Sequence, residues 1–131
     1  MTAESQIKNW IALAEYDFDT ADAMLKSGRL LYVVFTCQQC LEKTLKAIYV
    51  KQHNVTPPYT HSLIKLVNET SICNVITEKQ LKFLDYLSTY YFEGRYTEEL
   101  DELKSNLSLK TANEIFDTTK TQFQWLKDQM N

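Results

Sequence analysis

The chain has 131 residues, 44% of them hydrophobic, a size and composition that suit one domain with a buried core. Its net charge of −3 argues against a strongly basic nucleic-acid-binding protein, although a local basic patch is compatible with it. The longest apolar run, residues 30–35, is too short to span a bilayer, and the first ten residues lack a signal-peptide pattern. We therefore expect a single cytoplasmic domain covering residues 1–131, with no membrane association.

The first half of the chain predicts two long helices. The first runs from about Ser5 to Lys26 on a helical apolar stripe and ends before Gly28, a residue suited to terminating a helix. The second runs from about Leu30 to His53, and its first turns are apolar on most sides. Such a helix is either deeply buried or covered by a partner helix.

Shorter elements and one further long helix follow. Pro57 and Pro58 fix a loop, after which Thr60 or Ser62 caps a short helix. Residues 77–80 fit a capping box that opens a helix extending to Tyr91 and an aromatic segment, residues 90–96. An acidic short helix follows from residue 97, and the last helix begins near Ser108 or Leu109. The fold class predicted is an all-α, up-and-down bundle of four to five helices.

Cys37 and Cys40 form a C-x-x-C pair within the second helix. A redox pair normally opens a helix after a strand, and a structural zinc site needs four suitably spaced ligands. Neither pattern is present, so we expect small, buried, reduced thiols and predict no metal and no cofactor.

The middle of the second helix separates apolar from polar residues. At about 100° per residue, an apolar stripe through Cys37 and Leu41 lies away from the polar side chains of Gln39, Glu42, Lys43 and Lys46. On residue types alone this is a solvated helix face.

This segment, QQCLEKTLKA, resembles the QQ-x-x-EK-x-x-KA signature of HEPN-domain proteins. Thr60-His61-Ser62-Leu63 and Gly94-Arg95-Tyr96 follow in the expected order, and the likeness covers roughly residues 5–126. The resemblance implies a helical bundle, a homodimer and a role connected with nucleotides or RNA. It also implies, for many members, a partner nucleotidyltransferase in a toxin–antitoxin pair.

The resemblance implies that ribonucleases of this family carry an R-x4-6-H motif. In that motif arginine holds the phosphate and histidine acts in general acid–base cleavage. Arg95 is followed by YTEELDEL, so Leu100, Asp101 and Glu102 occupy the positions of the histidine. A carboxylate is ionised near neutral pH, repels phosphate and is a poor general acid. We therefore expect a domain that binds a nucleotide or a partner protein and does not cleave RNA efficiently. The alternatives are a metal-independent ribonuclease toxin that uses Arg95 and His61, and a purely structural dimerisation module.

The predicted ligand site combines the second helix with the aromatic segment. Gln39, Lys43 and Lys46 share one stripe and are expected to face a groove reached by two further residues, Arg95 and Tyr91. His61 is a further candidate there, Glu42 is expected to pair with a lysine or Arg95, and Tyr96 to stack on a base. The alternative is an internal ion-pair network that only fixes helix packing.

Overall fold

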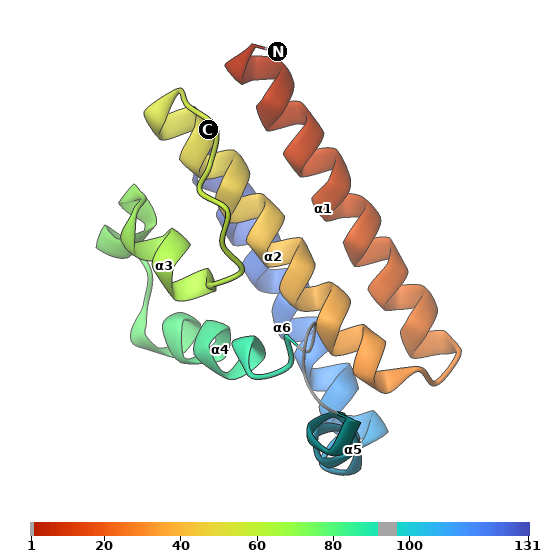
Figure 1. Ribbon diagram of the computed structural model, residues 1–131. Helices are drawn as coiled ribbons and strands as arrows, with labels where there is room; N and C mark the ends of the chain where they lie inside the picture. Colours follow the sequence, from red (N-terminus) through yellow and green to blue (C-terminus); the bar gives the residue numbers. More distant parts are fainter. Residues whose placement is uncertain (1, 92–96) are drawn as a thin grey trace.

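The structure, a computed structural model, describes residues 2–91 and 97–131 and forms only helices within those ranges (Figure 1). The predicted all-α class is confirmed. Six α-helices occur in the described ranges, because both short segments expected after Ser62 and near residue 97 are helical. None of the helices described there is both long and apolar enough to cross a membrane.

Helices α1 (Ala3–Lys26) and α2 (Leu30–His53) form an antiparallel pair. Gly28, in the left-handed region at φ +76°, makes the tight turn between them, as the sequence predicted. Ala14 and Ala21 on α1 are fully buried, and their small side chains allow the two helices to approach closely.

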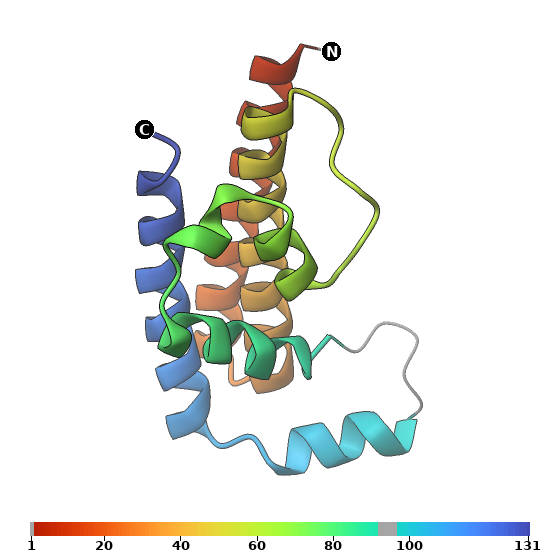
Figure 2. The same ribbon diagram turned by 90° about the vertical axis from the view of Figure 1, so that its left-hand side faces the viewer.

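Helix α6 (Leu109–Asp128) runs beside α2 in the same direction, and both chain termini lie at one end of the bundle (Figures 1 and 2). Phe18 on α1 stacks on Phe116 of α6, with ring centroids 4.8 Å apart, and also contacts Phe123 at 5.8 Å. These rings close the core between the three long helices.

Helix α2 is the centre of the molecule. It contacts α1, α6, α3 (Leu63–Asn68) and α4 (Glu78–Ser88), so it is enclosed on several sides. Val33 and Val34 in its first turns are fully buried, which confirms the predicted deep burial, whereas Tyr32 between Leu31 and Val33 is 51% exposed.

Caps set the ends of the shorter elements. Ser62 Oγ accepts a hydrogen bond from the backbone N–H of Lys65 at 3.1 Å and so caps α3, and the capping box predicted at residues 77–80 is present. A 3₁₀ turn, η1 (Ser71–Asn74), links α3 to α4, which crosses the long helices (Figure 2). Helix α4 ends at Ser88, earlier than predicted, so Tyr91 follows the helix instead of lying on it.

Helix α5 (Thr97–Ser105) lies at the opposite end of the bundle from the termini (Figure 1). The predictions made for Arg95 and Tyr96 fall on residues outside the described ranges.

Candidate functional site

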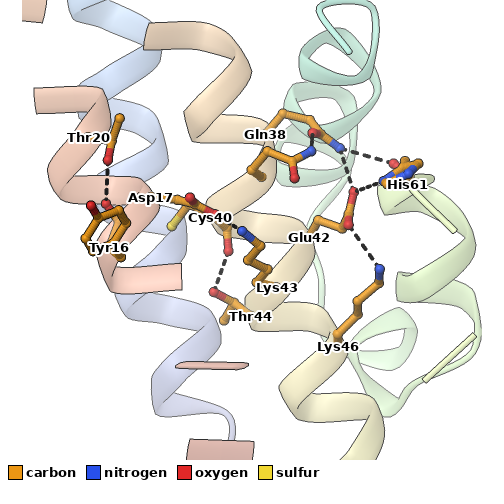
Figure 3. A network of polar contacts seen from close by, with 11 residues as sticks. Tyr16, Asp17, Thr20, Gln38, Cys40, Glu42, Lys43, Thr44, Lys46 and His61 are labelled. Carbon is orange, nitrogen blue, oxygen red and sulfur yellow. Dashed lines mark hydrogen bonds and ion pairs between the residues drawn. The ribbon is translucent and has the colours of Figure 1, made fainter. Parts of the chain in front are cut away.

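The carboxylate of Glu42 is buried in the middle of α2 and has three partners (Figure 3). Lys46 Nζ lies 3.0 Å from Oε2, one helical turn away, and His61 Nδ1 lies 3.0 Å from Oε1. Gln38 Nε2 donates a longer hydrogen bond, of 3.3 Å, to Oε1. Both carboxylate oxygens are therefore satisfied, as the burial of a charged group requires.

His61 belongs to the loop between α2 and α3, and the network holds its backbone as well as its ring. Gln38 Nε2 also donates to the His61 carbonyl oxygen at 3.1 Å, which ties this loop to α2. Because an ionised carboxylate only accepts hydrogen bonds, Nδ1 of His61 donates to Glu42. In a neutral ring, a proton on Nδ1 would leave Nε2 as an acceptor.

Aromatic rings surround the imidazole. His61 stacks on Tyr91 with centroids 4.4 Å apart and an interplanar angle of 21°, and Tyr59 meets it edge-on at 5.5 Å. The His61 side chain is 32% exposed and Tyr59 is 93% exposed, so these two rings form part of the surface. Tyr91 continues the contact to Phe35 on α2, at 5.8 Å.

The two signature lysines serve different interfaces. Lys46, 7% exposed, points toward Glu42 and His61, and its ammonium also lies 5.4 Å from the ring centroid of Trp10 on α1. Lys43 points instead toward α1, where Nζ lies 2.5 Å from Asp17 Oδ2 (Figure 3). Each lysine thus neutralises a carboxylate inside the fold.

The structure directs Lys43 toward Asp17 and Lys46 toward Glu42. It brings Glu42, Lys46 and His61 together with Tyr91, and Gln39 joins them only indirectly, through a 2.7 Å hydrogen bond to Gln38 Oε1. Gln38 itself is fully buried and was not among the predicted site residues. The signal for it was its position one turn before Glu42, within the QQ pair.

A family model for the HEPN domain matches residues 7–129. The chain belongs to the HEPN domain family. The resemblance carried by QQCLEKTLKA is therefore confirmed, and the Glu42 network shows what that signature does in this HEPN domain: it anchors the His61 loop to the central helix.

Two solved structures share the HEPN fold. TT1696 from Thermus thermophilus is 18% identical, with a TM-score of 0.79, covering 94% of this chain and 97% of that one. ST0689, an archaeal HEPN homologue, is 22% identical with a TM-score of 0.72, covering 95% and 98%. A comparison with curated proteins found no match. At these identities the structural likeness establishes the fold.

The two cysteines of the C-x-x-C pair are packing residues in this HEPN domain. Cys37 and Cys40 are fully buried, as predicted. Burial raises the pKa of the Cys37 thiol to about 12, and burial likewise raises the pKa of Cys40. Both side chains are therefore neutral thiols at physiological pH, with little nucleophilic or metal-binding character. Within the described residues no three His, Cys, Asp or Glu side chains are grouped as metal ligands would be.

Proposed function

We propose that this HEPN protein is a binding component that does not cleave RNA efficiently. The observation that carries the proposal is the chemistry of α5, where family ribonucleases would place the histidine of R-x4-6-H. Asp101 and Glu102 are exposed there, and Glu98 and Glu99 lie in the first turn, where acidic side chains favour the helix dipole. These carboxylates stabilise α5 but repel RNA phosphates and are poor general acids near neutral pH.

The pairing of the signature lysines supports the same function. An RNA backbone is held mainly by cations that are available to its phosphates. Lys43 and Lys46 are instead committed to Asp17 and Glu42. Their charges are internally compensated, which weakens any attraction for a polyanion.

We propose that the binding surface consists of His61 and Tyr91 together with the exposed ring of Tyr59. Arg95 and Tyr96 remain candidates for it because they follow Tyr91 closely in the sequence. In this arrangement Gln39, Glu42, Lys43 and Lys46 hold the helix and loop beneath the surface. Exposed aromatic rings on a fixed support are typical of sites that bind a base or a partner protein.

The partner that we propose is a nucleotidyltransferase-type protein, with which this chain forms a two-component, toxin–antitoxin-type pair. The test is co-purification of a nucleotidyltransferase encoded next to this reading frame with the tagged chain. Tyr59→Ala should reduce recovery of the complex about tenfold, the effect of one aromatic contact at the centre of an interface. Tyr16→Ala, which removes another exposed tyrosine, on α1, is the matched control and should retain the complex. Failure of the wild-type chain to form a complex at micromolar concentration would remove the proposed partner.

We also propose a homodimer. Tyr32 leaves a half-exposed ring on the first turns of α2, beside the partly exposed Phe35, and a second copy would cover both. Light scattering should give twice the mass of the chain at tens of micromolar, as an order of magnitude for a stable interface. A monomer mass at that concentration would rule the dimer out.

The second candidate function is a metal-independent ribonuclease, and one contact favours it. The hydrogen bond between Glu42 and His61 Nδ1 holds an imidazole in one orientation with Nε2 as an acceptor, an arrangement suited to a general base. This candidate requires His61 to act with Arg95 in reversed sequence order.

A further inference from the structure

A concave site lies at the end of the bundle opposite the chain termini. It is a cavity of about 310 Å³, lined by residues of the α1–α2 turn and of the end of α5. The side chains that line it are those of Arg29, Leu30, Leu31, Tyr32, Lys104 and Leu107. Its volume is at the lower end of the range for small-molecule sites, about 300–1,000 Å³.

The cavity is lined by two basic residues from separate elements. Arg29 precedes α2 and Lys104 lies in the last turn of α5, and both side chains are exposed. Neither forms an ion pair with a residue that the structure describes, whereas Lys43 and Lys46 each have a carboxylate partner. No acidic residue is among the described residues of the lining. Two such cations at one cavity, in a chain of net charge −3, favour an anionic ligand.

The remaining lining is apolar. Leu107 is buried, Leu30 and Leu31 are partly buried, and Tyr32 offers a half-exposed ring. A bare inorganic anion would leave these side chains in contact with water. A ligand with an apolar or planar group beside its charge would cover them.

We propose that this cavity binds a small organic phosphate, a phosphate monoester attached to a planar or apolar group. A phosphate monoester carries about −1.5 to −2 charges at neutral pH. Two cations balance that charge more closely than they balance the single charge of a carboxylate. Arg29 provides a planar guanidinium that can bind two phosphate oxygens, and Lys104 provides a point charge. The first turn of α2 has no side-chain cap, and the positive end of the helix dipole lies at the residues that line the cavity. The site is separate from Glu42 and His61, but it shares Tyr32 with the surface proposed for the homodimer, so a ligand and a second copy would compete for that ring.

The test is an NMR titration of the full-length protein with phenyl phosphate. The largest amide shifts are expected at residues 28–32 and 104–107, and the affinity should fall as salt rises. Inorganic phosphate and phenol, tested alone, should each bind more weakly than phenyl phosphate. The same titration is repeated with adenosine monophosphate. Tighter binding than that of phenyl phosphate would identify a nucleotide as the natural source of the monoester. Similar binding would support a site that recognises any phosphate monoester attached to a planar group.

Two variants and a matched control locate the site. Arg29→Gln and Lys104→Gln should each weaken phenyl phosphate binding about tenfold, the loss of one charge-assisted contact. Lys8→Gln removes an exposed cation near the start of α1, at the opposite end of that helix from the residues that line the cavity, and should not change the affinity. Absence of binding at millimolar phenyl phosphate, shifts centred elsewhere, or an equal loss in Lys8→Gln would overturn the proposal. Equal affinity for inorganic phosphate and phenyl phosphate would overturn the ligand class.

Discussion

The side chain of Glu42, on the central helix, receives a 3.0 Å hydrogen bond from Nδ1 of His61, a loop residue 19 positions further along the chain. Glu42 therefore links a rigid helix to a surface loop while it is also neutralised by Lys46. Because the acid is almost fully buried, its loss affects both the stability of the fold and the position of the loop.

Glu42→Gln should strongly destabilise the protein. The substitution keeps the shape of the side chain but leaves the buried ammonium of Lys46 without a counter-charge. Breaking a buried pair in this way reduces the free energy of unfolding by about 3–5 kcal/mol. Urea denaturation followed by circular dichroism measures the change. Glu78→Gln, which breaks an exposed pair of the same spacing with Lys82, should have little effect, and equal losses in the two variants would contradict the account.

Lys46→Met should be more destabilising than Lys43→Met. The first change removes the cation beside a carboxylate that is 3% exposed, whereas the second removes the cation beside Asp17, which is 16% exposed and can be hydrated. Thermal unfolding of the two variants gives the comparison. Greater loss in Lys43→Met would mean that the Glu42 network does not anchor the fold.

The same lysines explain what sequence reasoning could and could not predict. Helical stripes, Gly28 and the capping box place most helix ends correctly, because those signals are local. The stripe arithmetic also puts Lys43 and Lys46 on one polar face, but it does not reveal which neighbour covers each of them. That outcome depends on α1, which supplies Asp17 to Lys43 and the Trp10 ring to Lys46, contacts that are distant in the sequence. Gln38 was missed for the same reason, since its partner is the carbonyl of a loop residue.

Native thiol reactivity should be limited to Cys73, the exposed cysteine. Burial raises the pKa of Cys37 from 9.0 to about 12, so almost no thiolate is present at pH 8. A disulfide-exchange reagent should therefore modify one thiol rapidly in the native protein and all three thiols in denaturant. In Cys73→Ser the rapid phase should vanish, and a remaining rapid phase would show that Cys37 or Cys40 is accessible.

The buried thiol also predicts a loss of stability in alkali. The folded pKa of Cys37 lies above its unfolded value, so the neutral thiol contributes its full stabilisation below pH 9.0 and loses it as the pH rises toward about 12. Urea midpoints measured from pH 8 to 11 should fall. Cys37→Ala should show a smaller fall over the same range, and an identical fall would assign the effect to other groups.

RNA cleavage by the purified protein tests the central claim most directly. A mixed RNA pool should be incubated, without added metal, with the wild type, Arg95→Ala and His61→Gln. The account predicts no cleavage above background by any of the three, because Leu100, Asp101 and Glu102 occupy the positions of the missing histidine. Cleavage by the wild type that disappears in Arg95→Ala would contradict the account, and its loss in His61→Gln as well would establish the reversed Arg95–His61 ribonuclease.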